Sequence, residues 1–187
     1  MKFLKTFNRI PVKYFITKGK GQSDLAFHPG SYDEAVKDAD MENWNGVVYT
    51  SLIPSIAQQV PIPTIYPHGS ELMMIMARCD CRKGEKANAA LGSAWVFEKN
   101  KNMGGLVAEF SQVGERIDER IAKDFLSQSL NEMFKRRQYP SHYELRDAKM
   151  LGYESIKPNK NFGTALVALG FTEYHTPYEE LTEEELE

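Results

Sequence analysis

The chain has only two cysteines, no long apolar run, and no strong excess of charge of either sign. Cys79 and Cys81 are too few for a disulfide framework, and a structural zinc site needs four protein ligands, so we expect both to be reduced thiols. The basic N-terminus lacks the continuous apolar segment of a secretory signal, and no other segment reaches the length of a membrane span. These absences predict a cytoplasmic protein that does not insert into membranes.

The charges are unevenly spread along the chain. Basic residues gather within residues 1–20 and glutamates within 173–187, while the net charge is only −3. A calculated pI near 5.9 does not suit a nucleic-acid-binding domain, so we expect no nucleic-acid partner. We expect residues 173–187 to form a solvated acidic tail. The four histidines lack the spacing of metal ligands, and no P-loop or H-E-x-x-H motif occurs, so no metal site is predicted.

The length and the apolar pattern together predict one α+β domain. A chain of 187 residues with 42% hydrophobic content can bury an ordinary core. The stretches that favour strands are 12–17, 46–53, 71–79, 89–97, 104–111, 150–156 and 164–172. Apolar residues at helical spacing predict a long helix over 115–137, and a capping box at Ser31 predicts a short helix that ends near Met41. Strands followed by a long helix, without βαβ alternation, indicate the α+β class.

Two adjacent hydroxyl side chains, Thr50 and Ser51, lie within the apolar run 46–53 just before Pro54. Alone, this pair favours a polar end to a strand. A serine on a strained turn can also attack the carbonyl of the preceding residue and convert the amide to an ester. β-Elimination then cuts the chain, and the dehydroalanine at position 51 hydrolyses to a pyruvoyl group with loss of ammonia. Such a carbonyl forms a Schiff base with an amino acid and accepts electrons when carbon dioxide leaves.

Glu109 is an acid within the otherwise apolar stretch 105–110. Burial would raise the pKa of its carboxyl and keep it protonated near neutral pH, which suits a general acid. An outward-facing glutamate on an amphipathic strand explains the same pattern equally well.

Several short motifs follow one another between about Phe27 and Phe171. They are Tyr32-Asp33 followed by Ala35, Glu42-Asn43-Trp44-Asn45, Tyr49-Thr50-Ser51-Leu52-Ile53-Pro54, His68-Gly69, Gly104-Gly105-Leu106-Val107-Ala108-Glu109-Phe110, Phe162-Gly163 and Ala168-Leu169-Gly170-Phe171. In order and spacing they resemble the motifs of the pyruvoyl-dependent arginine decarboxylases, especially the bacterial branch. Archaeal members have two serines where this chain has Thr50-Ser51, and the second, reactive serine is retained.

The resemblance implies a self-processing carboxy-lyase made as an inactive precursor. It would convert L-arginine to agmatine and carbon dioxide with a covalent pyruvoyl cofactor made from Ser51. Cleavage between Thr50 and Ser51 would give a β chain, residues 1–50, and an α chain, residues 51–187. The segment 1–26 would be an N-terminal extension without an assigned function.

The resemblance also implies roles for three further residues. Asn45 would position the cleavage site and later the pyruvoyl carbonyl, and Glu109 would be the proton donor. Asp33 would bind the guanidinium of arginine, because a carboxylate accepts two parallel hydrogen bonds from that planar group. The implied fold is a single-domain, four-layer αββα sandwich that assembles as a homotrimer or a multiple of trimers, with active sites between protomers.

Two alternatives remain open from the residues. The enzyme class could be right with another amino acid as substrate, since Asp33 favours a cationic side chain but does not separate arginine from lysine or ornithine. A pyruvoyl decarboxylase of histidine is a further variant of this alternative. The second alternative is a non-catalytic trimeric relative that binds a ligand or a protein without processing. The pattern gives no preference between polyamine synthesis and acid resistance as the physiological role.

Overall fold

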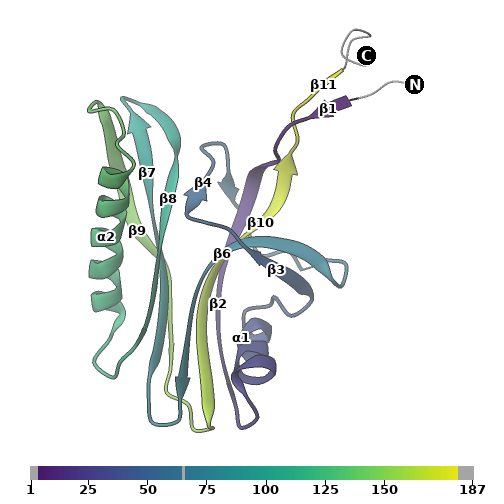
Figure 1. Cartoon of the computed structure of the whole chain (residues 1–187), viewed down its shortest axis with the longest axis vertical. Helices are drawn as coiled ribbons and strands as arrows, with labels where there is room; N and C mark the ends of the chain where they lie inside the picture. The colour runs from purple at the N-terminus through teal and green to yellow at the C-terminus, as the bar shows by residue number, and fades with distance from the viewer. Residues whose placement is uncertain (1–3, 65, 181–187) are drawn as a thin grey trace.

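Two large β-sheets, a two-stranded ribbon and two α-helices make up a single mixed α/β domain in the computed structural model, which describes residues 4–64 and 66–180 (Figure 1). The five-stranded sheet has the order β3–β6–β10–β2–β5, with bounds Trp44–Val48, Ser70–Arg82, Phe162–His175, Ile10–Ser23 and Gln58–Gln59. The four-stranded sheet has the order β4–β8–β7–β9, with bounds Leu52–Ile53, Lys101–Val113, Ala87–Glu98 and Tyr143–Ile156. This content is consistent with the predicted α+β class.

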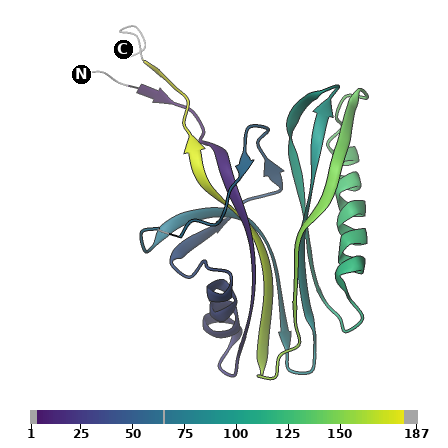
Figure 2. The same cartoon turned by 180° about the vertical axis from the view of Figure 1, so that it is seen from behind.

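The two sheets pack face to face, and each has a helix on its outer side. α1 (Tyr32–Asp38) packs on the five-stranded sheet, and α2 (Glu119–Arg136) packs on the four-stranded sheet. Figure 2 shows the same arrangement from behind, with the two sheets between the two helices. Fully buried aliphatic side chains such as Ile75, Leu91 and Val167 fill the space between the sheets. Neither of the described helices combines the length and the apolar character that a membrane span requires.

The close contact of α1 with its sheet depends on glycine. A Cβ added at Gly19 or Gly21 of β2 would clash with the backbone of Ala35 or Ser31. The helix therefore lies directly on the strand, as only a residue without a side chain allows.

The apolar run 46–53 is not one strand, and this prediction is wrong. Its first part, β3, pairs in parallel with β6 in the five-stranded sheet. Its second part, β4, pairs in antiparallel fashion with β8 in the four-stranded sheet. Apolar composition does not reveal a change of sheet, because strands in both sheets bury similar side chains.

The capping box at Ser31 is likewise absent. Ser31 is fully buried, and its hydroxyl shares a hydrogen bond of 2.8 Å with the hydroxyl of Thr164, which donates to Asp80 at 2.6 Å. The side chain thus ties the start of α1 to the sheet beneath it. α1 ends at Asp38, three residues before the predicted end.

The glutamate-rich end of the chain is partly structured. Residues 173–175 continue β10, and β11 (Tyr178–Glu180) pairs with β1 (Leu4–Thr6) as a two-stranded ribbon. This ribbon extends away from the two packed sheets (Figure 1). The predicted tail therefore does not begin at residue 173, and residues 181–187 lie outside the described part of the chain.

Both cysteines lie on β6 as buried free thiols. Burial raises the pKa of Cys81 to about 11, which keeps this thiol protonated at neutral pH. The burial of Cys79 raises its pKa as well. These environments agree with the predicted reduced, unreactive side chains.

Candidate active site

The Thr50–Ser51 peptide bond lies where the chain passes from one sheet to the other. On its N-terminal side, the backbone N–H of Tyr49 donates to the carbonyl of Met74 at 2.7 Å, in the five-stranded sheet. On its C-terminal side, the N–H of Val107 donates to the carbonyl of Ser51 at 2.9 Å, in the four-stranded sheet. The chain is therefore fixed on both sides of this bond, by hydrogen bonds to different sheets.

Strand register brings Glu109 close to Ser51. Leu52 lies opposite Leu106, and the hydrogen bond from Val107 extends this antiparallel register by one residue, to Ser51. Glu109 is two residues beyond Val107 on β8, so it shares the face of Val107 and is a diagonal neighbour of Ser51. Such neighbours are typically about 7–8 Å apart, within reach of a long side chain. Two of the predicted site residues, Ser51 and Glu109, are therefore neighbours in the four-stranded sheet.

The carboxyl of Glu109 has a perturbed environment. Its side chain reaches solvent at the surface of β8, yet surrounding atoms desolvate the carboxyl enough to raise its pKa above the ordinary value of 4.5. A raised pKa means that the group keeps its proton to higher pH than a free glutamate does. Glu109 is therefore neither fully buried nor an ordinary surface acid, and its environment favours the protonated form.

Asn45 and Asp33 lie away from Ser51 within one chain. Asn45 is at the start of β3, where its amide donates to the carbonyl of Gly69 at 2.8 Å. It precedes Tyr49 by four residues, or about 13 Å along an extended strand. Asp33 is exposed on α1, which both views place far from β4 (Figures 1 and 2). The fold of this one chain does not bring these two side chains to the Thr50–Ser51 bond.

A cavity of about 840 Å³ opens beside the crossing, with Thr50 in its wall. Asn8, Arg9 and Pro11 line it as well, although the sequence assigned no function to the segment that contains them. The guanidinium of Arg9 lies 4.9 Å from the ring centre of Tyr174 on β10. The sequence analysis did not single out Arg9, because no local motif marks it and only the tertiary fold places it in the same cavity wall as Thr50.

The position of Ser51 fits its conversion to a pyruvoyl group. Such a group keeps the backbone carbonyl of residue 51, which is the atom that the N–H of Val107 already binds. The adjoining cavity leaves space beside the bond that would be cut. The residues present therefore suit a prosthetic group made in place from this serine.

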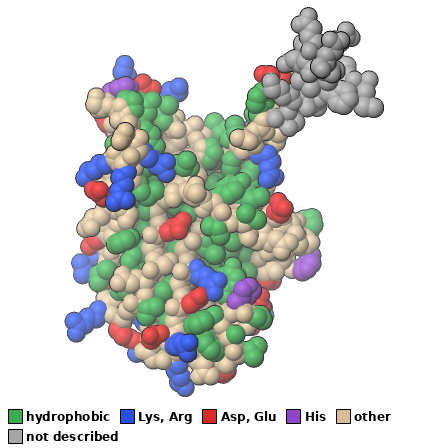
Figure 3. Space-filling view, viewed as in Figure 1, with side chains coloured by type: hydrophobic (Ala, Val, Ile, Leu, Met, Phe, Trp, Pro, Cys, Tyr) green, Lys and Arg blue, Asp and Glu red, His purple; other side chains and the backbone are tan. Residues whose placement is uncertain are grey.

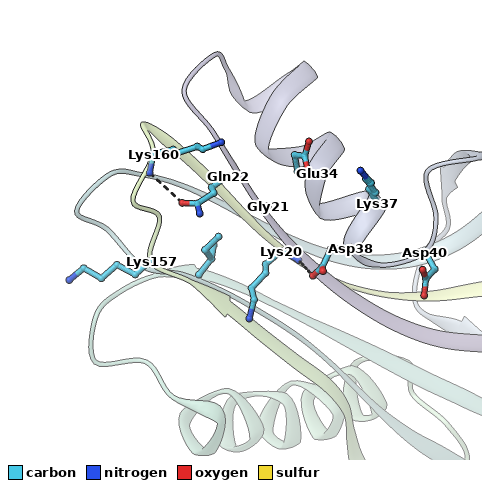
Figure 4. A pocket seen from close by; sticks show the side chains of 10 residues that line it. Lys20, Gly21, Gln22, Glu34, Lys37, Asp38, Asp40, Lys157 and Lys160 are labelled. Carbon is cyan, nitrogen blue, oxygen red and sulfur yellow. Dashed lines mark hydrogen bonds between the residues drawn. The ribbon is translucent and has the colours of Figure 1, made fainter.

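A second cavity, of about 780 Å³, lies between α1 and the turn after β9. Figure 4 shows lysines and acids interspersed around it, with the carbonyl oxygen of the Gln22 side chain accepting a hydrogen bond from the N–H of Lys160. Lys20 also pairs with Glu154 at 3.2 Å. None of the predicted site residues lines this cavity, and its mixed charges do not define a site for one class of ligand.

Comparison with known proteins identifies related sequences. The family model described as pyruvoyl-dependent arginine decarboxylase matches residues 13–176. Proteins named pyruvoyl-dependent arginine decarboxylase AaxB are 31% identical in Chlamydia pneumoniae and 32% identical in Chlamydia muridarum, each over 185 residues, covering 89% of this chain and 93% of the relative. A pyruvoyl-dependent arginine decarboxylase of Methanococcus aeolicus is 31% identical over 107 residues, covering 57% of this chain and 62% of the relative.

The raised pKa of Glu109 predicts a pH-dependent effect of Glu109→Gln on stability. The pKa of Glu109 in the folded state lies above 4.5, so near and above pH 4.5 the folded protein holds this proton more tightly than the unfolded chain does. The free energy of unfolding of the wild type therefore falls as the pH rises from about 4 to about 7. Gln cannot ionise, so the variant gains stability relative to its parent between about pH 4 and about pH 7. Urea unfolding of Ser51→Ala protein with and without Glu109→Gln measures this difference without interference from processing. If Glu109→Gln changed the free energy of unfolding equally at pH 4 and pH 7, the Glu109 carboxyl would not have a raised pKa.

Proposed function

Because the chain belongs to the pyruvoyl-dependent arginine decarboxylase family, we propose that it is a self-processing enzyme that converts L-arginine to agmatine and carbon dioxide. The observation that carries this proposal is the placement of Ser51 and Glu109 as diagonal neighbours where the chain crosses between sheets. The precursor would give a β chain, residues 1–50, and an α chain, residues 51–187.

Processing begins when Oγ of Ser51 attacks the carbonyl carbon of Thr50. The peptide C–N bond breaks, the nitrogen takes up the hydroxyl proton, and an ester remains. Loss of the Cα proton of Ser51 and cleavage of its Cβ–Oγ bond then release Thr50 as a carboxylate. The dehydroalanine left behind takes up water and loses ammonia, which completes the pyruvoyl group. The hydrogen bonds of Tyr49 and Ser51 to separate sheets support cleavage without loss of the fold.

The residues around Ser51 have separate tasks in turnover. A pyruvoyl group at residue 51 would supply a carbonyl for reaction with the substrate amine and an acceptor for the electrons left as carbon dioxide departs. The N–H of Val107 holds the adjoining backbone carbonyl in place. Glu109 stores a proton on its carboxyl and delivers it to the substrate α-carbon after the carboxylate has gone, a role that its raised pKa supports.

The remaining site residues, Asp33 and Asn45, would come from a neighbouring protomer of a homotrimer. Their distance from Ser51 within one chain supports a site shared between subunits. Val48, Leu52 and Ile56 expose 59%, 47% and 54% of their surface around the crossing, as is typical of a face that another subunit covers. Figure 3 shows hydrophobic side chains gathered along the middle of the face in view.

Asp33 would bind the guanidinium of arginine through paired hydrogen bonds, and Asn45 would position the pyruvoyl carbonyl.

The proposed protomer fold is the four-layer αββα sandwich. Three separate apolar clusters support it, one between the sheets and one beneath each helix. Each cluster buries the inner face of one layer against the next, which is the packing that such a sandwich requires.

Carbon dioxide release from a panel of amino acids tests the proposed activity. We expect release from arginine to exceed that from lysine, ornithine and histidine by at least about tenfold, because a site built for paired hydrogen bonds loses them with other side chains. Ser51→Ala should abolish release, since no pyruvoyl group can form. Release from arginine that survives Ser51→Ala, or an equal rate with lysine, would contradict the proposal.

Mixed trimers test whether the active site is shared between protomers. Asp33→Ala and Ser51→Ala should each inactivate the enzyme, since one loses substrate binding and the other the cofactor. Co-expressed in equal amounts, they should recover about a quarter of wild-type activity, because random assembly places an intact Ser51 beside an intact partner Asp33 in that share of sites. Carbon dioxide release from arginine measures the recovery.

A Glu109→Gln and Ser51→Ala mixture should recover no activity, since both residues belong to the same side of the site. Recovery in neither mixture, with mixed trimers present, would contradict a shared site.

A further inference from the structure

The cavity beside Thr50 has a single charged side chain in its described wall. That side chain is Arg9, and the other polar side chains that line the cavity carry hydroxyl or amide groups: Asn8, Tyr49, Thr50 and Tyr139. The rest of the wall comes mainly from apolar residues and glycines of β4 and β8, including Ile53, Met103 and Gly105. A cationic group in such a setting favours an anion within the same cavity.

Arg9 is held near the crossing by an aromatic group. Its guanidinium lies over the ring of Tyr174 at 4.9 Å, and the ring of Tyr49 packs against Phe171 with centroids 5.8 Å apart. Burial raises the pKa of Tyr174, Tyr49 adds to this rise, and Arg9 opposes it, so both residues lie close to the same hydroxyl. Tyr49 directly precedes Thr50, which places Arg9 on the β-chain side of the bond that is cut.

Cleavage creates an anion at this place. The uncut chain has a neutral amide at Thr50, whereas the processed β chain ends there in an α-carboxylate, which is ionised at neutral pH. The β chain would then end in the wall of the cavity that Arg9 lines. A guanidinium can bind a carboxylate through two parallel hydrogen bonds.

We propose that Arg9 binds the new Thr50 carboxylate and holds the cut end of the β chain clear of the pyruvoyl group, an inference that rests on the proposed self-cleavage. Arg9 is thus a positioning residue. The competing partner for Arg9 is the carboxylate of the substrate. An ion pair with that group favours the reactant over the transition state, because the charge is lost as carbon dioxide leaves. The chemistry therefore favours Thr50.

A double-mutant cycle tests this role. Arg9→Gln is placed in the processed protein and, separately, in Ser51→Ala protein, which retains the amide at Thr50. Removal of the ion pair should lower the melting temperature of the processed protein by about 2–4 °C more than that of the uncut protein. Thermal unfolding at one protein concentration measures the difference, and mass spectrometry establishes the cleavage state of each sample. Arg9→Lys should reduce the extra loss, because it keeps the positive charge.

Lys13→Gln is the matched control, since Lys13 pairs with Glu173 in the same part of the chain and does not line the cavity. It should lower the melting temperature equally in both backgrounds. Equal losses for Arg9→Gln in fully processed and uncut protein would overturn the role of Arg9 and leave self-cleavage intact. If Arg9→Gln lowered the melting temperature equally in both backgrounds and also raised the KM for arginine, Arg9 would bind the substrate carboxylate instead. A single uncut chain in the Ser51-containing sample would overturn both self-cleavage and this inference.

Discussion

The organisation of this protein depends on the passage of one short segment between two sheets. The hydrogen bonds from Tyr49 to Met74 and from Val107 to Ser51 fix the two ends of the segment in different sheets. Neither hydrogen bond uses an atom of the Thr50–Ser51 peptide bond, so cutting that bond removes neither of them directly. A protein that makes a cofactor by cutting its own chain must keep its fold after the cut, and this arrangement satisfies that need. The same register that holds Ser51 places Glu109 beside it.

Local composition gave much of the fold but not the way in which its strands combine. The long strands β6, β7 and β8 and the helix α2 follow from apolar patterns that extend over many residues. The run 46–53 was misjudged because its division between sheets depends on partners remote in sequence. Ser31 was misjudged because a buried hydroxyl, Thr164, competes successfully with the local cap. In both cases a tertiary contact overrides a local preference.

The candidate site shows the same limit. Motif spacing predicted roles for Ser51 and Glu109, which the register of the four-stranded sheet makes neighbours, but it did not show that Asn45 and Asp33 lie elsewhere in the chain. Spacing along a chain contains no information on symmetry, so it cannot test the proposed site between subunits, which would need no proximity within one chain. Arg9 was missed for a related reason, since its place beside Thr50 follows from tertiary folding alone. Family membership supplied the chemistry, whereas the structure supplied the neighbours.

In the proposed enzyme, the Thr50–Ser51 bond is broken within a fold that stays intact. Mass spectrometry of the purified protein, first under denaturing and then under native conditions, distinguishes this from an uncut chain and from separated fragments. We expect two chains under denaturing conditions, residues 1–50 and a pyruvoyl-blocked chain from residue 51, and a single assembly that contains both under native conditions. One intact chain with an unmodified Ser51 after prolonged incubation would contradict it, as would dissociation of the two fragments under native conditions.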